Sequence, residues 1–194
     1  MRKFDLVVFI LLVLGSGLLG GCGLGGDSQS FVREDIDLGY YEKVAVLPFE
    51  NHTSDAFAAD RLRDIAMTQL MATGSYDVVD KGLVDSVLLE EAIEKNAPLS
   101  KATLGRLGQL LNVQAVLLGS VDQASEARGG GGFGYPEVSL TLRLVDTSSG
   151  TVVWQASGHR SGYSLAGRLF GAAPKDEFQI SLDLIKDLLA GVVK

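Results

Sequence analysis

The sequence predicts an α/β protein of the α+β type: a mixed central sheet, helices packed on that sheet, and an antiparallel hairpin toward the carboxyl terminus. Three observations predict this class. Up to about residue 121, apolar runs with the length of strands alternate with segments of helical periodicity. From Val138 onward apolar and polar residues alternate one by one, which is typical of a strand with one wet face. A final amphipathic segment has helical spacing and can cover the sheet.

The first unit is a strand followed by a helix. The run from Val44 to Leu47 is apolar throughout and ends at Pro48, as a buried central strand would. A polar cluster at 51–55 then provides a turn and a helix cap, and the helix continues until Gly74. The residues that recur at helical spacing in it are Ala58, Leu62, Ile65, Ala66, Gln69 and Leu70.

A second group of elements completes the alternating half. We expect a short strand at 76–80, two helices, and a buried strand at 114–121. Ser100 is positioned to cap the second of these helices. The inward positions of the two helices are predicted to be Leu83, Val87, Leu88 and Ile93, followed by Leu104, Leu107 and Leu111.

The second half of the domain predicts a hairpin and a covering helix. A polar turn at 146–150 connects the alternating strand to an apolar return strand at 151–156. Pro174 then opens a helix whose first turn is acidic, where the helix dipole favours negative charge. The face expected to cover the sheet consists of Phe178, Leu182, Ile185, Leu189 and Val192.

Residues 1–21 have the pattern of a secretory signal peptide. Positive charge at Arg2 and Lys3 precedes an apolar run that is shorter than the roughly 20 residues a membrane-spanning helix needs. The only cysteine of the chain, Cys22, follows directly after Leu19-Gly20-Gly21, and this context resembles the bacterial lipobox. We therefore expect cleavage before Cys22 and attachment of lipid, such as palmitate, to this residue. A single cysteine also excludes an intramolecular disulfide.

The segment 22–38 is predicted to be a lipidated flexible tether, because it is rich in glycine and then in charged residues. Fully extended, about 16 such residues reach roughly 50 Å. The remaining residues, 39–194, are the right length for a single domain. Gly23 stands where lipoproteins retained in the inner membrane usually carry Asp, so the resemblance implies anchoring in the outer membrane, facing the periplasm.

The sequence offers no support for a catalytic, metal or cofactor site, and we do not expect an enzyme. The formal net charge of −7 argues against nucleic acid as a partner. His52 and His159 lack a second ligand at metal-binding spacing and are interpreted as turn residues. No serine lies in a Gly-x-Ser-x-Gly motif, and the glycines at 129–134 lack the Lys and Ser/Thr of a phosphate-binding loop. Asp77, Asp80 and Asp85 lie at element ends, where acids are common.

Several motifs in order resemble the CsgG-related periplasmic lipoproteins. They are Val44-Ala45-Val46-Leu47-Pro48-Phe49-Glu50-Asn51, the phrase at 73–80, the run 115–121, and Leu142-Arg143-Leu144-Val145-Asp146 through Gly150 to Trp154. The resemblance implies the fold of the TolB amino-terminal domain. It is closest to PelC-like members, because 121–138 is too short and glycine-rich for the membrane hairpins of CsgG. It implies a homo-oligomeric, ring-forming component of an apparatus that exports polysaccharide or protein beside an outer-membrane pore. An LpoB-like activator of a peptidoglycan synthase is the alternative.

Two segments contain candidate interface residues. Phe133 and Tyr135 follow the glycine-rich stretch 129–132, where exposed aromatic rings could contact a neighbouring protein or fold back onto the domain. Arg168 and Phe170 lie in an unusually apolar connection before the last helix. That connection is either buried beneath the helix or part of a contact with another subunit or partner.

Overall fold

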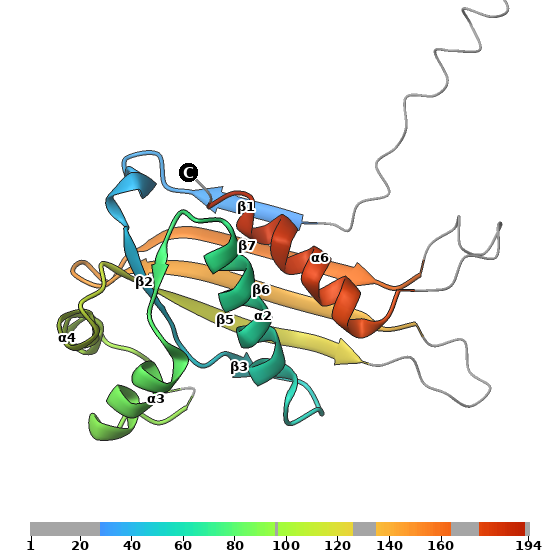
Figure 1. Cartoon of the computed structure of the whole chain (residues 1–194), viewed down its shortest axis with the longest axis horizontal. Helices are drawn as coiled ribbons and strands as arrows, with labels where there is room; N and C mark the ends of the chain where they lie inside the picture. The colour runs from blue at the N-terminus through green and yellow to red at the C-terminus, as the bar shows by residue number, and fades with distance from the viewer. Residues whose placement is uncertain (1–27, 96, 126–134, 164–174, 193–194) are drawn as a thin grey trace, which may run out of the picture.

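The computed structural model describes residues 28–95, 97–125, 135–163 and 175–192. Their centre is a seven-stranded mixed sheet with the order β1-β7-β6-β5-β2-β4, and β3 also pairs with β5 (Figure 1). The strands are β1 (Ser28–Val32), β2 (Lys43–Val46), β3 (Glu50–Asn51), β4 (Asp77–Val78), β5 (Ala115–Ser125), β6 (Glu137–Asp146) and β7 (Val152–Ser161). The predicted mixed sheet is confirmed.

The sheet has a parallel part and an antiparallel part. β2 runs parallel to both β4 and β5, and helical crossovers connect these strands. β5, β6, β7 and β1 are antiparallel neighbours, and β6 and β7 form the predicted hairpin. The alternating half and the hairpin half of the sequence therefore meet at β5.

Helices cover both faces of this sheet (Figure 1). The helices α2 (Ala58–Ala72) and α6 (Glu177–Leu189) pack on one face, over a core that includes Trp154. The helices α3 (Lys81–Glu90) and α4 (Lys101–Leu111) pack on the other face, over a smaller core around Val116 and Leu107. A short 3-10 helix, η2 (Leu38–Tyr40), precedes β2. None of the helices in the described part of the chain combines the length and apolarity that a membrane crossing needs.

Local sequence determines where three of these helices begin. The side chain of Ser100 accepts a hydrogen bond from the Thr103 N–H at 3.1 Å, which confirms the predicted cap of α4. Asp80 caps α3 in the same way, and Asp176 caps α6. An acidic residue at this position also complements the positive end of the helix dipole.

The buried face of α6 differs from the predicted one. Phe178 is 62 % exposed and Leu182 is half-buried, although both were expected to cover the sheet. The buried row consists of Ile180, Ser181, Leu184, Ile185, Leu188 and Leu189. Apolar residues stand at i, i+4 and i+7 from Phe178 and at i, i+4 and i+8 from Ile180, so periodicity alone does not determine the rotation of the helix. Leu83 on α3 is likewise exposed rather than inward.

The predicted tether at 22–38 is wrong from Ser28 onward. Ser28–Val32 form β1, which pairs antiparallel with β7 from Ser28 opposite Gly158 to Val32 opposite Trp154. The Arg33 N–H extends this pairing by donating to the Val153 carbonyl at 3.0 Å. The hairpin would otherwise leave β7 as an edge strand with unpaired backbone groups, and β1 supplies their partners. The structured domain therefore begins before residue 39.

Candidate interaction surfaces

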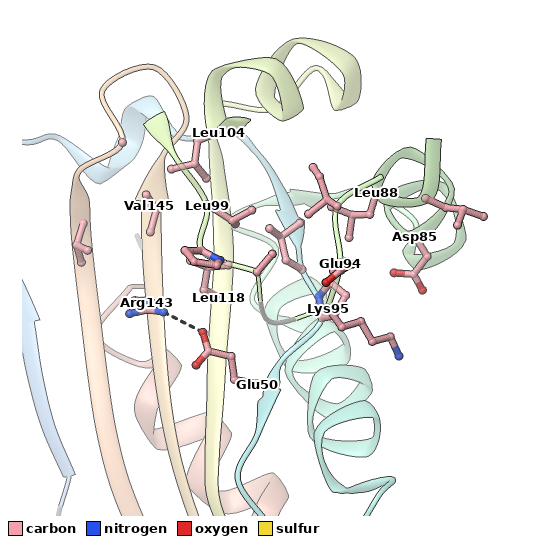
Figure 2. A pocket seen from close by; sticks show the side chains of 18 residues that line it. Glu50, Asp85, Leu88, Glu94, Lys95, Leu99, Leu104, Leu118, Arg143 and Val145 are labelled. Atoms are coloured by element: carbon pink, nitrogen blue, oxygen red, sulfur yellow. Dashed lines mark hydrogen bonds and ion pairs between the residues drawn. The ribbon is translucent and has the colours of Figure 1, made fainter. Parts of the chain in front are cut away.

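A groove of about 820 Å³ lies between α3, the segment that follows it, and the sheet (Figure 2). Its walls are mostly apolar. Leu88 and Leu89 contribute from α3, Leu118 and Val145 from β5 and β6, and Pro98 from the connection to α4. Leu89 is 81 % exposed. Because the lining comes from elements far apart in sequence, only the folded chain presents this surface.

One ion pair lies at the floor of the groove. Nη2 of Arg143 on β6 is 3.4 Å from Oε1 of Glu50 on β3. A dashed line marks this ion pair in Figure 2. His52, directly after β3, places Nε2 3.6 Å from the other carboxylate oxygen of Glu50. All three side chains are partly exposed. This arrangement can bind polar groups of a partner, but it places no hydroxyl nucleophile against a general base.

The other residues that were considered as catalytic or metal-binding groups lie apart from one another in the structure. Asp77 lies in β4, Asp80 caps α3, and Asp85 pairs with Arg63 at 2.8 Å. His159 lies on β7 opposite Ser139 of β6. Among the residues that the structure describes, no three His, Cys, Asp or Glu side chains converge in a manner suited to a metal ion.

Of the five predicted site residues, the structure describes Tyr135. Its ring is half-buried and meets the ring of Tyr163 edge to face, with centroids 5.1 Å apart. Tyr135 thus folds back onto the domain, which was one of the two alternatives for this residue. Cys22, Phe133, Arg168 and Phe170 lie outside the described residues.

A second surface lies at the end of the sheet where β1 begins. Ser28 pairs near the end of β7, the last residue of β7 (Ser161) pairs with Glu137, and Glu137 pairs with Ser125 at the end of β5. We call this the Ser28 end. Figure 1 shows the first turn of α6 at the same end. A β-carbon at Gly162, just after β7, would lie 2.6 Å from the Lys175 carbonyl, so the two segments are in close contact.

Two exposed phenylalanines stand at the Ser28 end. Phe57 precedes α2 and is 70 % exposed, and Phe178 lies in the first turn of α6. Arg61 connects the two helices by binding Asp55 at 2.6 Å and Glu177 at 2.9 Å. Its hydrogen bond holds the pKa of Asp55 below the ordinary value. Sequence reasoning missed this pair of rings, because Phe178 fits the apolar spacing of its helix.

The family comparison identifies the relationship of the chain. The model of the family described as "Curli production assembly/transport component CsgG" matches residues 39–169, more than half of the chain. The chain belongs to the CsgG family. This membership associates it with assembly and export. No curated protein matched it.

Solved structures agree with the assignment to the CsgG family. A point-substituted PelC dodecamer from Paraburkholderia phytofirmans is 25 % identical, with a TM-score of 0.61, and the match covers 87 % of this chain and 99 % of that chain. A second PelC dodecamer from the same organism is 24 % identical, with a TM-score of 0.60 over 87 % and 98 %. Lipoprotein GNA1162 from Neisseria meningitidis shares the fold at 19 % identity, with a TM-score of 0.51 over 67 % and 91 %. The predicted resemblance is therefore confirmed.

Proposed function

We propose that this protein is a non-enzymatic lipoprotein, anchored through Cys22 to the periplasmic face of the outer membrane, that forms a ring in an apparatus exporting polysaccharide or protein. One observation carries the proposal: the match to the PelC dodecamer covers 99 % of that chain at 25 % identity. Almost the whole of a protein that forms a dodecamer thus has its counterpart in this domain. Closed rings use two different surfaces of each subunit.

The segment from Cys22 to Asp27, which we call the leash, is short, and this supports a role close to the membrane. Pairing of β1 with β7 leaves a segment of six residues, from Cys22 itself to Asp27, before the sheet begins. Six extended residues reach about 20 Å at most. An LpoB-like activator would have to reach through the peptidoglycan, for which a long arm is needed. The alternative role is therefore the weaker one.

Two measurements test the proposal. We expect the wild-type protein to incorporate radioactive palmitate and to fractionate with the outer membrane, and Cys22→Ser to lose both properties. In detergent, the purified acylated protein should form a ring in negative-stain images, with a mass by light scattering that is a multiple of the subunit mass. A monomer that stimulates a purified peptidoglycan synthase would instead favour the alternative. A monomer that does not stimulate the synthase would also overturn the proposal that the protein forms a ring.

A further inference from the structure

We propose that β1 orients the domain, so that the Ser28 end, with Phe57 and Phe178, lies against the phospholipid surface that holds the lipid anchor. The inference rests on the proposed acylation of Cys22. It concerns which part of the domain meets the bilayer and which element determines this. The pairing of Ser28 with Gly158 carries the argument, because it places the start of the leash at one end of the sheet.

The length of the leash restricts the possible orientations. The six residues from Cys22 to Asp27 reach about 20 Å when fully extended. Gly158 lies six residues from the start of β7, or about 20 Å along the strand, and the turn at 147–151 extends farther. If the opposite end of the domain faced the bilayer, the leash would have to be longer than its extended length. If the Ser28 end faces the bilayer, the leash does not have to be stretched.

Without β1 this restriction would disappear. If residues 28–38 were free, the leash would contain about 16 residues and reach roughly 50 Å. That length would allow either end of the domain to face the bilayer. Pairing of β1 with β7 thus shortens the leash, and the orientation of the domain depends on the five residue pairs between these strands.

The Ser28 end has the side chains that suit a lipid surface. Phe57 and Phe178 are exposed by 70 % and 62 %, and the bridge from Arg61 to Glu177 keeps the helix starts that carry them together. Aromatic rings on the apolar side of a membrane-surface element enter the boundary between headgroups and acyl chains. Several charges near the two rings are paired within the domain, since Arg61 binds Asp55 and Glu177 and Lys175 binds Asp183. Contact with lipid therefore does not leave these charges unpaired.

The experiment compares three labelled positions in the acylated full-length protein. Phe57→Cys, Phe178→Cys and Leu89→Cys each provide one thiol for an environment-sensitive fluorophore, because Cys22 is blocked by lipid. Leu89 is the matched control, being 81 % exposed but located in the groove on α3. The proteins are reconstituted into phosphatidylethanolamine vesicles with a minority of phosphatidylglycerol and a nitroxide-labelled quencher lipid. We expect several-fold stronger quenching at 57 and 178 than at 89. Equal quenching, stronger quenching at 89, or none at any position would overturn the inference.

Two further variants test the role of β1. Because the Arg33 N–H donates to β7, the alternation of an antiparallel ladder directs the Phe31 N–H toward β7 and the Ser30 N–H away from it. Phe31→Pro should therefore weaken the pairing and reduce the quenching difference, while Ser30→Pro should preserve it. A Gly-Ser insertion before Ser28 lengthens the leash without altering the fold and should reduce the difference as well. If the insertion leaves the full difference, β1 does not determine the orientation and the inference fails.

The outcomes separate this inference from the proposed function. Mass spectrometry of the amino-terminal peptide reports acylation of Cys22 independently of orientation. If that residue carries no lipid, the proposed anchoring fails together with the inference. If acylation and ring formation are intact but the three labels are quenched equally, only the orientation is wrong.

Discussion

The guanidinium group of Arg63 donates two hydrogen bonds to the main-chain carbonyl of Val46, from Nε at 3.2 Å and from Nη2 at 2.8 Å. Arg63 lies on α2 and is 1 % exposed, and Val46 is the last residue of β2. A third bond from Nη1 reaches Asp85 on α3 at 2.8 Å. One side chain thus connects the strand before Pro48 to helices on both faces of the sheet.

Replacing Arg63 should destabilise the fold much more than replacing its neighbour Arg61. Arg63→Met keeps most of the volume but leaves the Val46 carbonyl and Asp85 without this partner, and we expect a loss of about 2–4 kcal/mol in the free energy of unfolding. Arg61→Met breaks more exposed ion pairs and should cost less than about 1 kcal/mol. Urea denaturation followed by circular dichroism measures both values. Equal losses would show that the buried contacts of Arg63 contribute little.

Two glycines on α4 should respond to the same substitution with opposite signs. A β-carbon at Gly105 would lie 3.7 Å from the Thr147 carbonyl, an ordinary contact, so Gly105→Ala should stabilise the helix by about 0.5–1 kcal/mol. At Gly108 the added carbon would lie 2.6 Å from the Thr147 hydroxyl oxygen, which bonds to the carbonyls of Val113 and Gln114. Gly108→Ala should therefore cost about 1–3 kcal/mol. Thermal melting of both variants checks the signs, and a gain in both would contradict the close packing.

Gly119 and Phe49 should be energetically coupled. A β-carbon at Gly119 of β5 would lie 2.6 Å from the ring of Phe49, so Gly119→Ala should destabilise the protein by about 1–3 kcal/mol. In a Phe49→Ala background the ring is gone, and the same substitution should cost much less. A double-mutant cycle based on urea denaturation measures the coupling. Strict additivity of the two losses would contradict this contact.

The sequence predicted the longer elements, whose apolar patterns are local, and it missed β1, whose cause lies in a distant part of the chain. β2, β5 and the hairpin have continuous or strictly alternating apolar residues, and each was located correctly. β1 shows no such pattern, because all of its residues are exposed. It forms because β7 has a free edge, and this depends on residues more than 100 positions away. Local polarity therefore made a strand resemble a tether.

The two candidate surfaces were harder to predict from the sequence than the fold, because they exist only in the folded chain. The groove requires α3, β5 and β6 to come together, and no motif connects them in sequence. The aromatic pair depended on the rotation of α6, since Phe178 and Ile180 begin competing apolar rows. Packing against the sheet selected Ile180. Cys22 could be proposed from the sequence alone, because signal peptides are recognised as linear sequence and not through a fold.

Acid should remove the contribution of Asp146 to stability. Burial by itself would raise the pKa of this carboxyl, but bonds from the Ser149 N–H and from the hydroxyls of Ser148, Ser149 and Tyr41 outweigh burial and lower the pKa. Because the folded state holds the carboxylate more strongly, this stabilisation is present above the unfolded pKa near 3.9 and is lost as the pH falls through the lower folded value.

Asp146→Asn should therefore unfold at clearly lower urea concentration than the wild type at neutral pH, and the gap should narrow as the pH falls below about 4. The matched control is Asp64→Asn, whose carboxylate pairs with Lys81 at the surface and should change the urea midpoint little at either pH. The hydrogen bonds at Asp146 hold the turn between β6 and β7, so its loss should also loosen that turn. A gap that stays constant down to pH values well below 4 would mean that ionisation of Asp146 is not what stabilises the hairpin.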